Sequence, residues 1–263
     1  MSPFGPLEEF RRRPIGDLTA ARARMQGARR HPIARSNAHY GEGLVAARSV
    51  GLAGENFYHA TRNPPYWRRI EGSIPDLLLR ETVGALLARV NARLGAAGLE
   101  LFLLDAWRPK AVQAYFHDVW MPAELLRRDP ALAGEALTRA VERYWAAPSR
   151  DDASPAPHAT GGEVDLTVRW IGGEPLWMGS IFDDATPLAH RDRFETFGDS
   201  AMSFSDEEAR ANRRLLHWAM AEQGFAGLPD EWWHFSWGDQ IWAKLGGADA
   251  AHYGLARPPF GDG

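Results

Sequence analysis

The sequence predicts an α+β fold in which helices pack against a small, mainly antiparallel sheet. Apolar residues recur at helical spacing in some segments and alternate in others, and these segments follow one another irregularly, with no glycine-rich turn after a strand. The chain has 263 residues, 45% of them hydrophobic and 24% charged, which is typical of a packed globular protein. This composition excludes disorder, collagen and coiled coil, and no apolar run approaches the roughly 20 residues of a membrane span.

The first half of the chain predicts a helix, a strand, a second helix and a further helix in turn. The first helix has one apolar stripe and ends near Gly98. Residues 99–104 indicate a buried strand that ends at Asp105, and Pro109 suits the first turn of a helix over Lys110–Trp120. The stripe of the first helix consists of Leu79, Val83, Leu86, Leu87, Val90 and Leu94, and the further helix is marked by Leu137, Val141, Tyr144 and Trp145.

The second half begins with a loop over Asp151–Pro157, rich in Pro, Ser, Ala and Asp. The next segment, 163–168, alternates, so that one face carries apolar side chains for the core and the other carries polar ones. A capping box of Ser205 and Glu208 predicts the start of a helix that ends at Gly224. The segment Glu231–Trp237 predicts a short aromatic strand.

The chain is expected to comprise three parts, of which charge distinguishes the first: a basic N-terminal arm (1–40), a main domain (41–246) and a C-terminal tail (247–263). The arm holds eight Arg against Glu8, Glu9 and Asp17, a local charge of 8 − 3 = +5, which leaves −4 − 5 = −9 for the remainder. A loosely structured, solvated arm is favoured over a nucleic-acid contact, because the acidic body repels phosphates. The start of the chain has no apolar segment of a secretory signal, so we expect a cytoplasmic protein without a membrane partner.

Three segments contain polar residues within apolar surroundings, and these polar residues are candidates for catalysis. The segments are 105–109, 158–165 and 231–234. The chain contains no cysteine, so any metal must be bound by His, Asp and Glu. An open zinc site needs three such ligands, and His158, Asp165 and His234 supply them. Glu231, close to His234, is a candidate base, but residues 231 and 234 point to opposite faces of an ideal strand. Glu231 must therefore lie in the turn before the strand, or at a bulge.

Each of these signals also has an ordinary structural explanation. A single histidine in an aromatic stretch, such as His234, is more often a core residue than a ligand. Trp232, Trp233 and Trp237 fit core packing, and Asp105 with Arg108 fits a buried ion pair beside a strand end.

Taken together, the three segments resemble the VanX-type zinc D-Ala-D-Ala dipeptidases, which belong to the LAS group of metallopeptidases. The resemblance extends from about Asn56 to Trp237. It includes Asn56 and Phe57, the run from Asp105 to Lys110, His158 with Gly161, Asp165 and Thr167, the run from Met178 to Asp183, the run from Asn212 to Leu215, and the run from Glu231 to Phe235. It implies the LAS fold with its hedgehog-type sheet.

The resemblance implies a role for each matching residue. His158, Asp165 and His234 would bind Zn²⁺, and Glu231 would be the general base and later the general acid. Arg108 would polarise the scissile carbonyl, and Asp183 would bind the free amino group of the substrate. A small dipeptide-like substrate is then expected, with no nucleic acid as partner.

Two departures from the family pattern fall on the expected substrate pocket. Ala156 and Pro157 stand at and beside a position where the family has a serine, and Glu163 stands where it has alanine. Because Glu163 shares a strand face with Asp165, we expect it to face the cleft and to bind substrate; the alternative is that it turns to solvent or pairs with Arg169. A cleft filled in this way predicts weak hydrolysis of D-Ala-D-Ala, improved in Glu163→Ala.

The expected activity is zinc-dependent hydrolysis of a peptide bond in a small peptide with a free amino terminus. Two alternatives are an amidase or carboxypeptidase acting on a cell-wall or natural-product fragment, and a zinc-binding LAS-fold module without catalysis. The retention of Glu231 and Arg108 beside the three metal-binding residues argues against a module without catalysis.

Overall fold

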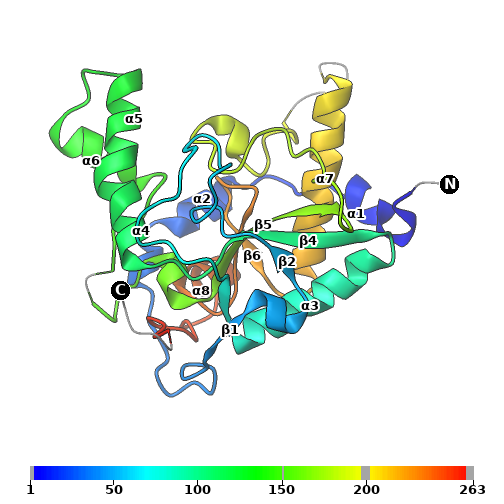
Figure 1. The fold of residues 1–263 in the computed structure, drawn as a ribbon, viewed down its shortest axis with the longest axis horizontal. Helices are drawn as coiled ribbons and strands as arrows, with labels where there is room; N and C mark the ends of the chain where they lie inside the picture. The colour runs from blue at the N-terminus through cyan, green and yellow to red at the C-terminus, as the bar shows by residue number, and fades with distance from the viewer. Residues whose placement is uncertain (1–2, 150, 197–201, 259–263) are drawn as a thin grey trace.

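A five-stranded sheet crosses the middle of the computed structural model, which describes residues 3–149, 151–196 and 202–258 (Figure 1). The strand order is β2-β4-β5-β7-β6, and only the pairing of β2 with β4 is parallel. A separate antiparallel pair joins β1 and β3. These contacts confirm the predicted α+β fold with a mainly antiparallel sheet. The strands are β1 (Leu44–Ala46), β2 (Ala53–Gly54), β3 (Leu78–Arg80), β4 (Leu99–Asp105), β5 (Glu163–Trp170), β6 (Ala226–Gly227) and β7 (His234–Ser236).

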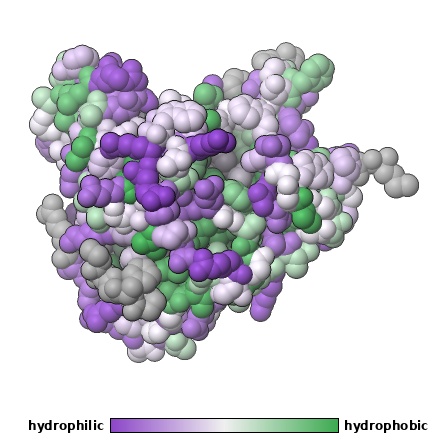
Figure 2. Space-filling model, viewed as in Figure 1, coloured by the Kyte–Doolittle hydropathy of each residue, from purple (hydrophilic) through white to green (hydrophobic). Residues whose placement is uncertain are grey.

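Helices surround this sheet. The helix α3 packs along β4 and also contacts α7, whereas α4, α5 and α6 lie together at one side of the molecule (Figure 1). On the face seen in Figure 2, hydrophilic residues surround smaller apolar areas. The helices are α1 (Glu8–Arg12), α2 (Thr19–Met25), α3 (Glu81–Gly95), α4 (Lys110–Tyr115), α5 (Met121–Arg128), α6 (Gly134–Glu142), α7 (Phe204–Ala221) and α8 (Gln240–Gly246). Within the described ranges, no helix is both long and apolar enough to cross a membrane.

The central strand β5 is buried on both faces over its first six residues. Its apolar face, formed by Val164, Leu166 and Val168, belongs to the main hydrophobic core. Its other face carries Glu163, Asp165 and Thr167, which are buried as well. Buried polar side chains require partners, so this face of β5 is where a polar site must be assembled.

Several predicted boundaries differ from the observed ones. Leu79 belongs to β3, where it pairs with Val45, and the helix starts only at Glu81. An apolar residue just before a helix extends the helical spacing whichever structure it adopts, so the pattern alone placed the boundary too early. The predicted strand Glu231–Trp237 is shorter, spanning only β7, because a turn occupies the residues before it.

Two other helices also differ from the prediction. The helix from Lys110 ends as α4 at Tyr115 and continues through a π-helical turn, Phe116–Trp120, into α5. The helix α7 begins two residues earlier than predicted, because Ser203 and Asp206 form the capping box in place of Ser205 and Glu208. The side chain of Asp206 is long enough to bond the backbone N–H of Ser203, so the motif does not require Glu.

The N-terminal arm is folded onto the body, in contrast to the loosely structured arm that we expected. Leu7 and Phe10 are buried in the main core, and α1 packs against α7. The guanidinium of Arg11 is buried; it donates to Asn212, and to Glu208 at 2.8 Å. The high arginine content of the arm suggested that it is solvated, but Leu7 and Phe10 are enough to hold the arm in the core, and the Arg11 side chain is buried with them.

Candidate metal and catalytic site

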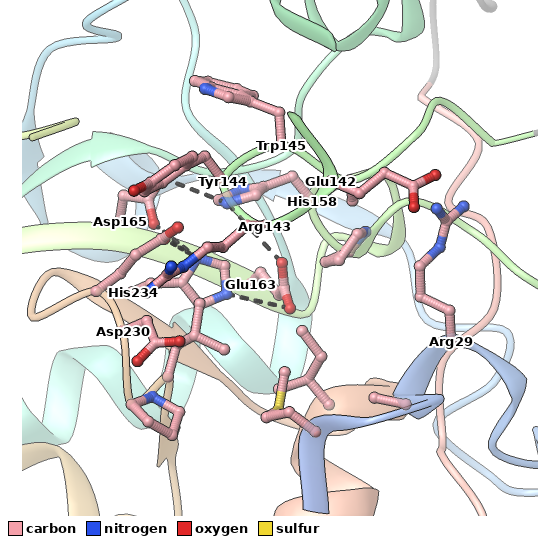
Figure 3. A pocket seen from close by; sticks show the side chains of 18 of the residues that line it. Arg29, Glu142, Arg143, Tyr144, Trp145, His158, Glu163, Asp165, Asp230 and His234 are labelled. Atoms are coloured by element: carbon pink, nitrogen blue, oxygen red, sulfur yellow. Dashed lines mark ion pairs between the residues drawn. The ribbon is translucent and has the colours of Figure 1, made fainter. Parts of the chain in front are cut away.

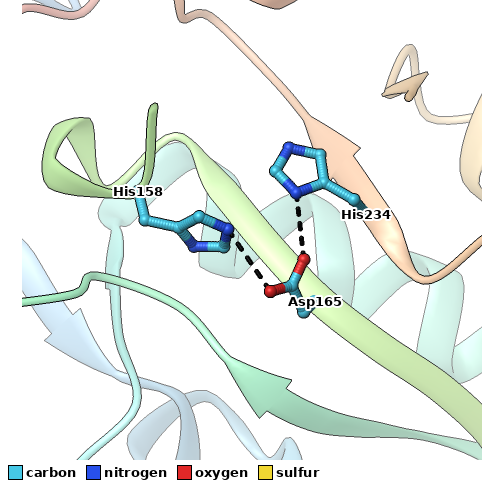
Figure 4. Close-up of side chains that lie close together, drawn as sticks. All are labelled: His158, Asp165 and His234. Atoms are coloured by element: carbon cyan, nitrogen blue, oxygen red, sulfur yellow. Dashed lines mark ion pairs between the residues drawn. The ribbon is translucent and has the colours of Figure 1, made fainter. Parts of the chain in front are cut away.

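Three buried side chains meet beside the central strand. Ligand atoms of His158, Asp165 and His234 all lie within 4.8 Å of one another (Figure 4). Nε2 of His158 is 3.3 Å from Oδ2 of Asp165, and Nδ1 of His234 is 3.0 Å from Oδ1 of the same carboxylate. The structure thus brings together the three residues that the sequence singled out as metal ligands.

The sheet explains why these residues meet. Asp165 on β5 is directly opposite His234 on β7, so their side chains leave the sheet on the same face. His158 lies in a short 3₁₀ turn, Pro157–Thr160, that leads into β5. Between them Gly161 adopts φ +70°, and a Cβ there would come within 2.6 Å of the Leu44 side chain. The chain can turn so tightly at this point because the residue is glycine.

His158 is oriented by the backbone. Its Nδ1 lies 2.8 Å from the carbonyl oxygen of Ala106, just beyond the end of β4. Because a carbonyl only accepts, Nδ1 carries the proton, and Nε2 presents its lone pair toward Asp165.

Glu231 lies outside β7, in the segment before the strand, as the sequence argument required. Its Oε2 is 3.6 Å from Nδ1 of His234, and its side chain is one-fifth exposed. Burial raises the pKa of Glu231 to about 8; Asp165 and Asp183 add to the rise, whereas His234 and Arg108 oppose it. A metal cation beside Glu231 would also oppose the rise, and would favour the proton-accepting carboxylate near neutral pH.

Arg108 is buried next to the carboxylate of Asp165. Its Nε donates to Oδ2 of Asp105 at 2.9 Å, and a terminal nitrogen lies 3.4 Å from Oδ2 of Asp165. Gln113 accepts a second guanidinium N–H at 2.8 Å, and Arg108 lies 4.8 Å from the ring centre of Trp145. The predicted ion pair with Asp105 is present, and it holds the guanidinium at the cluster.

Two tyrosines that the sequence analysis did not single out hold Asp183. The hydroxyls of Tyr58 and Tyr66 both donate to Oδ2 of Asp183, at 2.9 and 2.8 Å. Burial and the neighbouring Asp165 raise the pKa of Asp183 to about 7, against the two hydroxyls and Arg108. Tyr58 directly follows Asn56 and Phe57 of the family resemblance, which was the available signal; Tyr66 carried none. Gln113 and Trp145 were missed in the same way.

Glu163 lines the same cleft as the cluster, as expected, but its side chain has no exposed surface. Its carboxylate is fully buried, accepts a hydrogen bond from Ser236 at 3.0 Å and lies 3.2 Å from Nε2 of His234. It neither turns to solvent nor pairs with Arg169, which binds Glu100. Burial opposes ionisation of Glu163, but His234 outweighs it and holds the pKa of Glu163 at about 2.

The cluster forms part of the wall of a cleft of about 780 Å³. This volume is within the usual range for a small-molecule site. Pro157 and Ser154 line the cleft, whereas Ala156 is buried behind it and donates its N–H to Ser149. The N-terminal arm supplies another part of the wall through residues 25–30 and Arg22. The side chains of Arg29, Glu142 and Trp145 are seen with those of the cluster in Figure 3.

The donor set fits a zinc ion. Two imidazoles and one carboxylate are a common catalytic zinc set, and they leave a coordination position open toward the cleft. Each histidine has an oxygen near its other ring nitrogen, as is usual for zinc-binding histidines. The Ala106 carbonyl accepts from Nδ1 of His158, and the Glu163 carboxylate lies 3.2 Å from Nε2 of His234.

Comparison with known proteins identifies the family. The family described as D-Ala-D-Ala dipeptidase, peptidase M15, matches residues 73–250. A D-alanyl-D-alanine dipeptidase of Synechocystis is 34% identical over 174 residues, which cover 61% of this chain and 70% of that protein. Those of Enterococcus faecalis and Escherichia coli are 28% and 29% identical, over 59% and 60% of this chain and 70% and 65% of their own.

A solved structure was found as well. It is a VanY D,D-pentapeptidase from a VanB-type vancomycin resistance cassette, in complex with Zn(II), which aligns with a TM-score of 0.36 at 15% identity over 61% of this chain and 73% of its own. The family match alone spans more than half of the chain. It contains the cluster of His158, Asp165 and His234, and also Arg108, Asp183 and Glu231. The resemblance seen in the sequence is thereby confirmed, and the chain belongs to the M15 peptidase family of D-Ala-D-Ala dipeptidases.

Proposed function

We propose that this peptidase uses zinc to hydrolyse the peptide bond of a D-Ala-D-Ala-like dipeptide with a free amino terminus. The observation that carries the proposal is the meeting of His158, Asp165 and His234 on one wall of a cleft that also contains Glu231, Arg108 and Asp183. The three ligands would hold the ion. When bound, zinc supplies Lewis-acid catalysis, polarising a carbonyl and making water a nucleophile near neutral pH.

Glu231 is the proposed proton carrier. Its carboxylate is close to His234 and partly open to the cleft, so it can accept a proton from the attacking water and return it to the leaving amine. Arg108 is the proposed donor to the developing oxyanion. Its hydrogen bonds to Asp105 and Gln113 fix the guanidinium before the reaction, which is what electrostatic stabilisation of a transition state requires.

Asp183 is proposed to bind the substrate's ammonium group. Both tyrosine hydroxyls bond Oδ2, which leaves Oδ1 outside these two hydrogen bonds. An ammonium group beside this buried carboxylate would favour its ionised form. Arg29, Arg30 and Arg143 also line the cleft and supply positive charge toward which the substrate's carboxylate would be directed.

The cleft argues for a short substrate. A longer peptide would require an extended groove. Residues 25–30 of the arm form part of the cleft wall, and this favours a short substrate. Glu163 also lines the cleft, with its carboxylate buried against Ser236 and His234, and weak D-Ala-D-Ala hydrolysis, improved in Glu163→Ala, stays a prediction.

A substrate panel tests the proposal. Zinc-loaded protein is incubated with D-Ala-D-Ala, L-Ala-L-Ala, N-acetyl-D-Ala-D-Ala and D-Ala-D-Ala amide, and free amino groups are measured. We expect hydrolysis of a free dipeptide and a loss of at least 100-fold in kcat/KM on N-acetylation. Faster cleavage of the acetylated substrate would favour a carboxypeptidase instead. Bound zinc without hydrolysis of any member would favour the non-catalytic zinc module.

A further inference from the structure

Glu163 is a buried carboxylate that the reaction proposed above does not use. It lies on β5 opposite Ser236, and the next pair on the same face of the sheet is Asp165 with His234. A carboxylate with no exposed surface is costly to bury unless cations or hydrogen-bond donors compensate it. Its position beside two metal-binding histidines therefore requires an explanation.

The contacts of Glu163 include these two histidines, Ser236 and the carboxyl group of Asp239. Oε1 accepts the hydrogen bond of Ser236 and lies 3.2 Å from Nε2 of His234. Oε2 lies 3.8 Å from Nε2 of His158 (Figure 3). The ring of His234 is therefore between two carboxylates, with Asp165 at 3.0 Å from Nδ1 and Glu163 near Nε2.

This arrangement selects one form of the imidazole. A neutral histidine has a proton on one ring nitrogen and a lone pair on the other, and only the lone pair can bind a metal. Each ring nitrogen of His234 faces a carboxylate: Nδ1 faces Asp165, which is a proposed metal ligand, whereas Nε2 faces Glu163, which is not. With the ion held by Asp165, the nitrogen left to donate a proton is Nε2. Ser236 holds the Glu163 carboxylate in place, so the proton is favoured on Nε2 and the lone pair on Nδ1.

We propose that Glu163 is a positioning residue that holds His234 in the tautomer presenting Nδ1 to the metal ion. The proposal rests on the zinc site proposed above. A carboxylate in this place orients the ring and strengthens the imidazole as a donor. On His158 the corresponding nitrogen, Nδ1, donates to the Ala106 carbonyl at 2.8 Å and lies 3.2 Å from Oδ2 of Asp105, which also pairs with Arg108. The two histidine ligands are therefore oriented by different means, and only His234 depends on Glu163 for its tautomer.

Zinc affinity provides the first test. The wild type, Glu163→Ala and Glu163→Gln are titrated with zinc against a chromophoric chelator. We expect a 10- to 100-fold weaker affinity in Glu163→Ala. Glu163→Gln should lie between the two, because its amide oxygen still accepts a hydrogen bond but has no charge. Ser154→Ala, in the cleft wall but away from both histidines, is the control and should bind zinc like the wild type.

The tautomer itself provides the second test. In ¹⁵N-labelled, zinc-loaded protein, long-range ¹H–¹⁵N correlation shows which ring nitrogen carries the proton. We expect Nε2–H for His234 and Nδ1–H for His158 in the wild type. His158 should be unchanged in both Glu163 variants, which separates a local effect on His234 from a general loss of structure.

Three outcomes would overturn the proposal: Glu163→Ala with wild-type zinc affinity, a proton on Nδ1 of zinc-bound His234, or a cobalt-substituted Glu163→Gln whose visible absorption shows a changed coordination number. The last result would make Glu163 a ligand of the metal. In each case the wild type would still bind zinc and hydrolyse a dipeptide. A wild type that binds no zinc would instead contradict the function proposed above.

Discussion

His158, Asp165 and His234 each offer one ligand atom, and these three atoms all lie within 4.8 Å of one another. We therefore expect His158→Ala, Asp165→Ala and His234→Ala each to lose most bound zinc, measured by metal analysis of purified protein. His190→Ala is the matched control, because His190 lines the same cleft outside the cluster. Full zinc occupancy in one of the three variants would remove that residue from the ligand set.

Glu231 acts, in our proposal, on protons and not on the metal. Glu231→Gln should keep the fold and the zinc content but lose about 10²–10⁴-fold in kcat, the usual contribution of a positioned acid–base group. Steady-state kinetics on the best dipeptide, together with metal analysis, checks this. Glu135→Gln, on the exposed side of α6, should behave as the wild type. Undiminished turnover in Glu231→Gln at neutral pH would assign the proton transfer to another group.

Most of these residues could be identified from the sequence, but their partners could not. His158, Asp165, His234 and Glu231 stand out because polar residues interrupt apolar runs. Tyr58 and Tyr66 do not stand out, since an aromatic residue with a polar end is ordinary in a core. Glu163 was placed on the correct strand face, but its carboxylate is covered by the side chains of Ser236 and His234 on the neighbouring strand β7, and strand periodicity contains no information about which side chains cover it.

At the scale of elements, the contact between α1 and α7 is the clearest difference from the sequence-based expectation. Phe10 is 6% exposed and belongs to the main core. Phe10→Ala should therefore destabilise the protein by about 3 kcal/mol, as measured by urea unfolding. Arg12→Ala, on the exposed side of the same helix, should change stability by less than about 0.5 kcal/mol. Equal, small effects of both changes would indicate a detached arm.

A second contact fixes α2 beside the catalytic segment. Arg22 donates to Asp192 and to Asp230, each at 2.6 Å, and Asp230 directly precedes Glu231. Burial would raise the pKa of Asp192, but Arg22 outweighs it and the pKa is lowered. A carboxyl with a lowered pKa stabilises the fold above its unfolded pKa, about 3.9, and loses this contribution as the pH falls through its folded value.

Arg22→Ala should consequently cost about 1 kcal/mol at pH 7. The difference from the wild type should shrink as the pH falls below about 4 and through the lowered pKa of Asp192, because the carboxyl group then becomes protonated in the folded wild type as well. Urea unfolding at several pH values measures it, with Arg24→Ala as a control on the same helix. A difference that is independent of pH would mean that Arg22 acts through packing alone.

Element boundaries show why the fold class could be predicted more accurately than its details. The strands β4 and β5 and the helix α7 were identified because their apolar periods are long and regular. The start of α3, the π-helical turn after α4 and the length of β7 depend on tertiary contacts of single residues. Leu79, for example, is fixed by its pairing with Val45 across two strands and not by its place in the helical stripe.

At the scale of the whole molecule, the proposed ligands come from a turn, the central strand and its neighbour, so the site exists only when the sheet is complete. A metal that binds the folded chain alone stabilises it by mass action, by about 4 kcal/mol at a thousandfold excess over Kd. For a chain of this size that corresponds to a rise in Tm of roughly 10 °C. Thermal unfolding with zinc and with a chelator measures the difference. The same Tm in both would show that the metal does not contribute to the folded state.

The arm and the two tyrosines have a further consequence for how relatives of this protein diverge. Residues 25–30, Tyr58 and Tyr66 all precede residue 73, where the family match begins, yet they form part of the cleft and hold Asp183. Substitutions there can reshape the cleft without touching a metal ligand or Glu231. Substrate preference and catalytic rate can therefore change through substitutions in separate parts of the sequence. Chimaeras that exchange residues 1–72 between relatives would transfer the substrate preference and keep the catalytic rate.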